Sequence, residues 1–284
     1  MHYLLASILA STSILVLFRW MQNSKAVTRH AIVVSYLGSV IAGMLLFDVD
    51  WSLVTRGWFL PAAAEGVGFY VVFRMIALAT QRSGITVASI ATKMSVVIPT
   101  LIGIVALGES VSIFKVAGLL AGTLAVFLAV GLKFKGNTQL KAIGWGLPAL
   151  VFICTGLIDA SLKLFQVWGL TDSQFPGFVV TIFGFAFLAA TSHHMLLPNR
   201  MVNRVSIVSG ILLGLANLGT VYFLLKALSV PSWESSIVYP LNNFGIVLVS
   251  ALVAILFFGE RLTTSVRLSL CFATGSIVLL YAAG

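Results

Sequence analysis

Two charged side chains lie deep inside long apolar stretches of this chain, where a charge is costly. Glu65 lies four residues after Pro61 in one stretch, and Lys93 lies near the middle of the next. A carboxylate in apolar surroundings can bind an ammonium group or carry a proton, and an ammonium there can bind an anionic group. The structural alternative is an ion pair between Glu65 and Lys93 that holds two helices together. The residues alone leave both interpretations open.

A second polar group lies in a late apolar stretch and consists of Tyr239, Asn242 and Asn243 around Pro240. Adjacent residues on a helix point about 100° apart, so the two amides do not both face lipid. They could orient a bound metabolite through hydrogen bonds, or they could join neighbouring helices as polar contacts. Asn217 is a weaker candidate of the same kind.

Two further ionisable residues have competing interpretations. Arg74 lies nearer the end of its stretch, so it can either reach the membrane surface or contribute to a binding site. Asp159 is followed at i+4 by Lys163, a spacing typical of an ion pair on a helix surface, and this interpretation is favoured for it. The substrate-binding candidates are therefore Lys93, Glu65, Tyr239, Asn242, Asn243, Asn217 and Arg74.

The composition requires a membrane to surround these residues. The chain has 284 residues, of which 60% are hydrophobic and 9% are charged. Soluble domains carry about 25% charged residues, so this chain lacks the polar surface that a soluble fold needs. The net charge of +9 indicates a lipid bilayer and not a nucleic acid as partner, because Lys and Arg concentrate in short connectors.

Ten apolar stretches are long enough to be membrane-spanning helices, each needing about 20 residues. The fold class expected is therefore all-α integral membrane. The polar connector from Lys133 to Lys141 divides the spans five and five, into a first repeat, 1–135, and a second, 140–284. The predicted spans are 2–20, 31–48, 58–80, 84–106, 111–133, 143–165, 174–197, 205–229, 234–258 and 266–283.

The fourth and ninth spans both end in a Gly-Glu pair, Gly108-Glu109 and Gly259-Glu260, which indicates an internal duplication. Five spans per copy is an odd number, so the second copy enters the bilayer from the opposite side. The expected result is two inverted five-helix repeats around a central cavity, an architecture typical of secondary transporters. The glutamates themselves are interpreted as structural, because they follow glycine where a span ends.

The segments SVVIPTLIGIVALGES (Ser95 to Ser110) and SSIVYPLNNFGIVLVSALVAILFFGERLT (Ser235 to Thr263) give the chain a family resemblance. With ten spans in two repeats, it resembles the EamA-like transporters of the drug/metabolite transporter superfamily. The resemblance implies a multi-pass protein of the bacterial inner membrane that moves a small-molecule substrate. It also implies that both termini are cytoplasmic, whereas the distribution of Lys and Arg places them outside. The orientation stays open.

The function predicted is secondary transport of a small polar or zwitterionic metabolite by alternating access, with proton coupling and a homodimer as further expectations. One alternative is a broad exporter of lipophilic cations, and another is a non-transporting membrane scaffold. An enzyme is not expected, because the chain has no HExxH, GxSxG or phosphate-binding Gly-Lys loop. No metal and no cofactor are expected.

Overall fold

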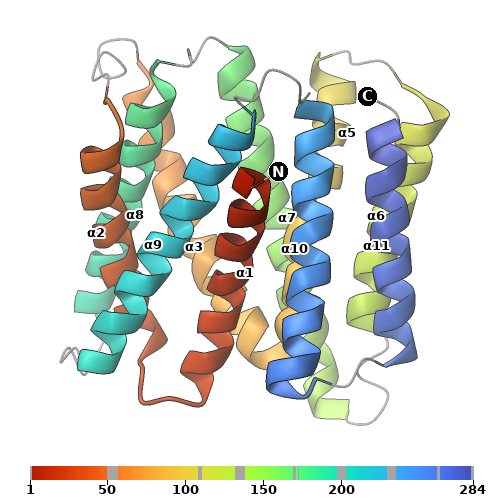
Figure 1. Ribbon diagram of the computed structural model, residues 1–284, viewed down its shortest axis with the longest axis horizontal. Helices are drawn as coiled ribbons and strands as arrows, with labels where there is room; N and C mark the ends of the chain where they lie inside the picture. Colours follow the sequence, from red (N-terminus) through yellow and green to blue (C-terminus); the bar gives the residue numbers. More distant parts are fainter. Residues whose placement is uncertain are drawn as a thin grey trace.

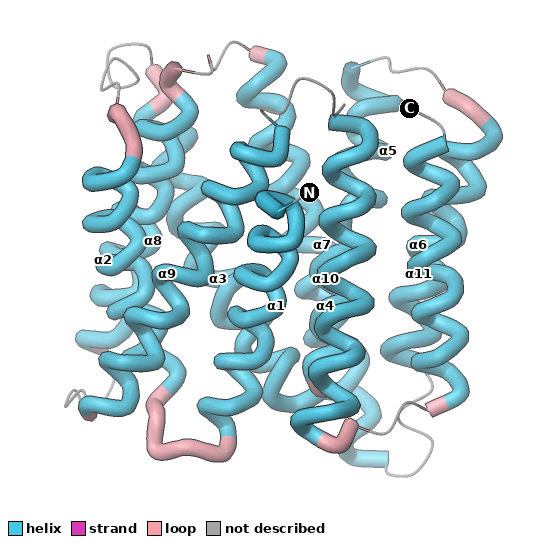
Figure 2. Tube along the Cα trace, viewed as in Figure 1, coloured by secondary structure: helices cyan, strands magenta, loops and turns pink. Residues whose placement is uncertain are grey.

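The chain forms a bundle of long helices that lie side by side, as Figure 1 shows. The computed structural model describes residues 2–49, 57–107, 111–131, 138–168, 171, 173–196, 203–228, 235–260 and 263–282. Every regular element within these residues is a helix, and Figure 2 shows no strand among them. Helices are expected of an apolar chain in lipid, because each helix satisfies its own backbone hydrogen bonds.

Glycines with positive φ end two of the helices. Gly84 has a φ of 91° and follows α3, and Gly259 has a φ of 60° and follows α10. Both values lie in the region that side chains with a Cβ avoid. In chain order the helices are α1 His2–Gln22, α2 Thr28–Leu46, α3 Phe59–Ser83, α4 Ile85–Lys93, the 3₁₀ helix η2 Met94–Val96, α5 Val97–Leu107, α6 Ile113–Gly131, α7 Thr138–Val167, α8 Phe175–Met195, α9 Arg204–Leu228, α10 Ser235–Phe258 and α11 Thr264–Ala282.

The helices coincide with the apolar stretches of the sequence, with one difference. The stretch 84–106 is interrupted, because α4 ends at Lys93 and α5 begins only at Val97, after the 3₁₀ turn η2. Pro99 accounts for the interruption, since it has no N–H for the carbonyl of Ser95 and its ring crowds that carbonyl. A 3₁₀ segment inside a long helix often marks a functional hinge.

The lengths and compositions of the helices are those of a multi-pass membrane protein. Within the described residues, seven helical segments are long and apolar enough to cross a membrane, counting α4, η2 and α5 as one segment. Shorter apolar stretches of α6, α7 and α10 cover Ile113–Leu128, Gly146–Leu162 and Asn242–Phe258. Large apolar side chains such as Leu45 and Phe257 are 80% and 78% exposed, which suits contact with lipid.

Two helix pairs that are distant in sequence approach closely through glycine. A Cβ on Gly214 of α9 would lie 2.6 Å from the backbone oxygen of Ser35 in α2. A Cβ on Gly66 of α3 would lie 2.5 Å from the backbone oxygen of Ile182 in α8. Small residues at such crossings bring helix backbones together in a membrane, where packing replaces the hydrophobic effect.

The pair α6 and α11 is also held by small residues. Ser276 of α11 donates a hydrogen bond to the backbone oxygen of Gly118 at 2.7 Å, and a Cβ on Gly122 would lie 2.8 Å from the Ser276 Oγ. Gly118 and Gly122 therefore form a helix-packing surface. Extensive contacts also join α1 to α9 and α10, and join α7 to α3, α4 and α5.

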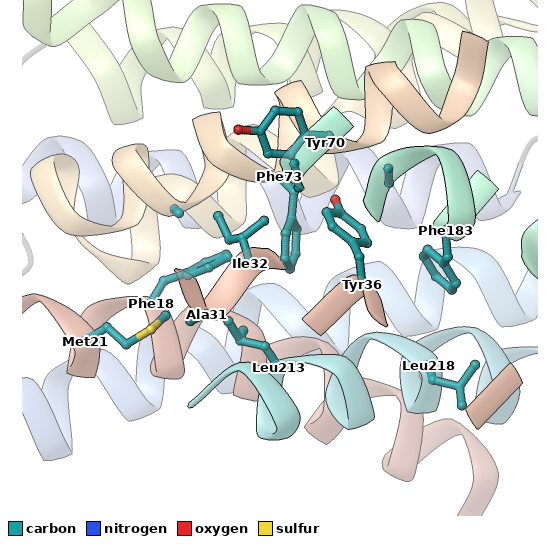
Figure 3. Close-up of a cluster of buried hydrophobic side chains, with 13 residues drawn as sticks. Phe18, Met21, Ala31, Ile32, Tyr36, Tyr70, Phe73, Phe183, Leu213 and Leu218 are labelled. Atoms are coloured by element: carbon teal, nitrogen blue, oxygen red, sulfur yellow. The ribbon is translucent and has the colours of Figure 1, made fainter. Parts of the chain in front are cut away.

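The described helices enclose buried apolar clusters on two sides of the bundle. Figure 3 shows one of them, where Phe18 of α1, Tyr36 of α2 and Phe73 of α3 pack together with side chains of α8 and α9. A second cluster joins α4 to α6, α10 and α11. The helices α3, α4 and α7 contact one another, and their facing sides carry the polar residues described next.

Candidate functional site

Glu65 lies on the side of α3 that faces α7 and is only 8% exposed. Its carboxylate accepts a hydrogen bond from the Ser161 hydroxyl of α7. The same hydroxyl also contacts the backbone oxygen of Ile158 at 2.8 Å, so its position is fixed by its own helix. The structure therefore gives Glu65 a neutral partner. The alternative that the sequence left open, an ion pair between Glu65 and Lys93, does not occur within 4.0 Å among the described residues, where the salt bridge joins Arg19 to Glu260.

Asp159 of α7 is the second carboxylate at this position. Its Oδ2 accepts a hydrogen bond from the Ser95 hydroxyl of η2 at 3.4 Å, and the carboxylate interacts electrostatically with Lys93 and with Glu65. The structure thus gives Asp159 partners on other helices, and the surface ion pair with Lys163 that the sequence favoured stays a prediction. The side chain of Lys163 lies outside the described residues.

Asp159 faces the interior of the bundle and is nevertheless exposed. It lies nine positions after Leu150 and two after Leu157, which places it about 160–180° around the helix from these residues. Leu150 and Leu157 are 48% and 53% exposed and mark the outer face of α7. The exposed surface of Asp159 therefore lies on the inward side of α7, towards α3, α4 and α5 and away from lipid.

Lys93 is the last residue of α4, directly before the 3₁₀ interruption. Its side chain is half-buried, and Asp159 is the charged group that acts on it. Ser95 follows in η2, where its hydroxyl contacts both the Thr92 carbonyl at 2.6 Å and the Asp159 carboxylate. The interrupted helix therefore contributes an ammonium group and a hydroxyl at the same depth.

These residues form a polar site of two carboxylates, one ammonium group and two hydroxyls: Glu65, Asp159, Lys93, Ser95 and Ser161. Among these described side chains the carboxylates exceed the ammonium by one charge, so together they favour a cationic group when all three are ionised. Lys93 is balanced by Asp159, whereas the hydrogen-bond partner of Glu65 is neutral. Such a site can bind an ammonium group at Glu65 and an anionic group at Lys93, or it can exchange a proton.

The amide residues of α10 lie on two different faces. Asn242 shares a face with Ile246, which packs against α1 and α9, and it is 3% exposed. Asn243 shares a face with Val247, which packs against α4 and α11, and it is half-buried. Within the described residues, the Asn242 Oδ1 has no hydrogen-bond partner, and the side chain of Tyr239 is not among them.

The structure places two of the sequence candidates away from this site. Arg74 lies nine positions after Glu65 on α3, which is about 180° around the helix and about 13.5 Å along it. Asn217 shares a face of α9 with Gly210 and Gly214, which contact α2. Neither residue has a contact in the structure with the residues of α3, α4 and α7 that form the polar site.

The Gly-Glu pair after α10 has a structural role. The Glu260 Oε1 accepts a hydrogen bond from the backbone N–H of Ile85 at 2.9 Å, and Oε2 accepts one from the Thr86 hydroxyl at 3.4 Å. Arg19 of α1 lies 4.0 Å from the same carboxylate. Glu260 therefore caps the N-terminus of α4 and connects it to α1 and α10. The matching Gly-Glu pair at 108–109 lies outside the described residues.

No metal site is found among the described residues, and a groove on another side of the bundle is apolar. No group of three or more His, Cys, Asp or Glu among them could hold a metal ion. A groove of about 330 Å³ lies between α2, α3 and α8, but its lining residues, such as Val40, Met44 and Phe185, are nearly all apolar. It contains none of the charged residues, so the polar site of α3, α4 and α7 is the stronger candidate for a polar ligand.

The sequence pattern missed three contributors to this site. Asp159 could have been found by the rule that singled out Glu65, because it is also an acid inside an apolar stretch. Ser95 and Ser161 carry no such signal, since serines are common at helix contacts in membranes. Only the approach of α3, α4 and α7 shows that their hydroxyls meet the carboxylates.

Comparisons with known proteins establish the fold, and neither of the two similar proteins that follow indicates an activity. No protein-family model matches the chain. An uncharacterized protein of Haemophilus influenzae is 22% identical over 289 residues, covering 99% of this chain and 98% of that protein. A solved crystal structure covers 98% of this chain and 94% of its own, with a TM-score of 0.62 and 13% identity. This chain shares its whole fold with that structure.

Proposed function

We propose that this chain is a secondary transporter for a small metabolite that carries an ammonium group, either cationic or zwitterionic. The observation that carries the proposal is that Glu65, Asp159 and Lys93 lie on facing sides of α3, α7 and α4 beside the interruption of a membrane helix, with Asp159 interacting electrostatically with both other groups. Ionisable groups within a membrane are costly and mark substrate or ion pathways. Interrupted helices form the substrate and ion sites of many secondary transporters. The inward exposure of Asp159 supports access of a polar ligand to this site.

The helix packing supports two inverted repeats, 1–135 and 140–284, with ten spans in all. If each helix of the first repeat is exchanged for its counterpart in the second, the most extensive contacts are reproduced. The pair α2 and α9 becomes α8 and α3, and the pair α1 and α10 becomes α7 with the interrupted helix of α4 and α5. The pair α6 and α11 is converted into itself. This exchange is what a pseudo-two-fold axis in the membrane plane requires.

In the proposed mechanism, Glu65 binds the ammonium group of the substrate or a coupling proton. Lys93 binds an anionic group when the substrate has one. This contact replaces the interaction of Lys93 with Asp159, so the Asp159 carboxylate can then bind the substrate or water. The Asn243 amide, on the face of α10 that packs against α4, supplies hydrogen bonds to the substrate. The two repeats would expose the site alternately to each side of a bacterial inner membrane, as the resemblance to the EamA-like transporters implies.

Uptake into proteoliposomes tests this assignment. A thermal-shift screen with amino acids, primary amines and quaternary amines first identifies a ligand of the wild-type protein. Glu65→Gln and Asp159→Asn are each expected to reduce uptake by about tenfold or more, because a hydrogen bond to a charged group contributes about 1.5–3 kcal/mol. Asp48→Asn is the matched control, since Asp48 is exposed and lies beyond the end of α2.

The outcome also separates the rival functions. Normal uptake by correctly folded Glu65→Gln and Asp159→Asn proteins would remove the site assignment. Competition by quaternary amines and not by amino acids would favour an exporter of lipophilic cations. The described side chains of the site also suit that function, because they hold two carboxylates and one ammonium group. A wild-type protein that no ligand stabilises and that transports none of them would favour a membrane scaffold.

A further inference from the structure

A second polar cluster lies on the opposite side of α3, where the helix faces α8. The Arg74 Nη1 lies 2.8 Å from the His193 Nδ1 and 3.5 Å from the Tyr70 Oη. The Tyr70 Oη lies 2.5 Å from the same nitrogen of His193. Arginine can only donate hydrogen bonds, so Arg74 and its imidazole neighbour interact as donor and acceptor and not as an ion pair.

Histidines of α2 and α8 extend the cluster. The rings of His30 and His194 pack edge to face, with centroids 4.7 Å apart and an interplanar angle of 82°. His30 is 1% exposed, and the Nδ1 of His194 is buried without a partner within the described residues. The cluster therefore contains a buried ring nitrogen to which a ligand could bind.

The cluster carries positive charge that the described acids do not balance. The groups that act electrostatically on His193 are Arg74, Arg29 and His194, which are all basic. No carboxylate of the described residues lies within 4.0 Å of Arg74. The acid on the same helix, Glu65, faces α7 from the opposite side of α3. A neutral imidazole offsets little of the charge of Arg74, so the cluster favours an acceptor of opposite charge.

The position of the cluster is that of a membrane–water interface. His193 and His194 lie in the last turn of α8, and His30 lies in the first turn of α2. Arg74, His193 and His194 are half-buried, so the cluster is reachable from its edge. Anionic groups of the leaflet and of the aqueous phase both reach this depth.

We propose that Arg74, Tyr70, His193 and His194 bind a phosphate group. The guanidinium of Arg74 presents a planar set of N–H donors that matches two oxygens of a phosphate. The Tyr70 hydroxyl and the imidazoles can donate to the remaining oxygens, since each imidazole carries at least one N–H. A phosphate supplies the negative charge that the cluster lacks and a partner for the buried nitrogen of His194. The phosphate belongs either to an anionic phospholipid headgroup or to a soluble phosphate.

Thermal unfolding of the purified full-length protein tests the site in two arms. One arm titrates inorganic phosphate against chloride at matched ionic strength, in a neutral detergent. The other titrates phosphatidylglycerol against phosphatidylcholine in mixed micelles. We expect a saturable rise in the melting temperature in at least one arm, and a half-saturation concentration about tenfold or more higher in Arg74→Gln. Arg82→Gln is the control, because Arg82 is exposed in the last turn of the same helix.

The arms identify the source of the phosphate. A response to inorganic phosphate alone assigns the site to a soluble phosphate, and a response to phosphatidylglycerol alone assigns it to a lipid headgroup. A wild-type protein without a saturable response in either arm overturns the proposal, as does an unchanged half-saturation in Arg74→Gln. If Arg74→Gln does not fold, Tyr70→Phe and His193→Gln replace it. Wild-type affinity in both of these variants overturns the proposal equally.

Discussion

Replacing Glu260 by alanine is expected to destabilise the junction of α10 with α4. The backbone N–H of Ile85 is one of the donors that the start of a helix cannot satisfy internally, and Glu260 accepts it at 2.9 Å. Losing a helix cap costs about 0.5–2 kcal/mol, and losing a hydrogen bond to a charged group costs about 1.5–3 kcal/mol. These two ranges describe the same bond and overlap at about 1.5–2 kcal/mol, which is the loss in free energy of unfolding that we expect for Glu260→Ala.

Two companion substitutions separate the cap from the charge. Glu260→Gln keeps an oxygen for the Ile85 N–H and is expected to cost about 1 kcal/mol, since it loses the charge and the 4.0 Å pair with Arg19. Gly84→Ala places a Cβ 2.6 Å from the Glu260 Oε1. It also forces alanine to a φ of 91° and a ψ of 164°, a strain of about 1–3 kcal/mol.

Combining Glu260→Ala with Gly84→Ala in one protein gives a sharper test than either substitution alone. In the Glu260→Ala background the clash at residue 84 is removed, so Gly84→Ala should cost only its backbone strain there. The measurement is equilibrium unfolding in mixed micelles, followed by the fluorescence of the chain's 6 tryptophans. The capping argument fails if Glu260→Ala unfolds within about 0.5 kcal/mol of the wild type. It also fails if the two costs are additive.

Two other substitutions test the packing of the helices by the same unfolding measurement. Gly66→Ala should cost about 1–3 kcal/mol, because its Cβ would lie 2.5 Å from the Ile182 backbone oxygen and α3 would have to move from α8. Gly68→Ala is its control, since its nearest neighbour would be 3.5 Å away, and equal costs at the two positions would contradict the prediction. Ser276→Ala should cost about 0.5–1.5 kcal/mol through the lost 2.7 Å hydrogen bond to the Gly118 backbone oxygen, and an unchanged stability would show that this bond contributes nothing.

The sequence predicted the helices well and the membrane with them, because both follow from local properties. An apolar stretch of about 20 residues has one stable conformation in lipid, and a connector with glycine or charge ends it. The interruption after Lys93 was the exception. Pro99 signals it in the sequence, but the depth at which the helix breaks depends on its packing.

The sequence also singled out Glu65 and Lys93 as candidates, since an ionisable group in an apolar stretch is rare enough to be noticed alone. It grouped Arg74 with them, although Arg74 lies nine positions after Glu65 on the same helix. This spacing places the two side chains on opposite faces of that helix. It set Asp159 aside, because a lysine four residues later offered a partner on the same helix.

Only the tertiary structure decided which side chains meet. The partners of Asp159 are Ser95 and Lys93, more than sixty positions earlier in the chain, and Glu65 meets Ser161 across 96 positions. Local patterns fix the face on which a side chain lies relative to its own helix. They do not fix which helix covers that face, because that choice depends on how the small residues and grooves of all the helices fit together.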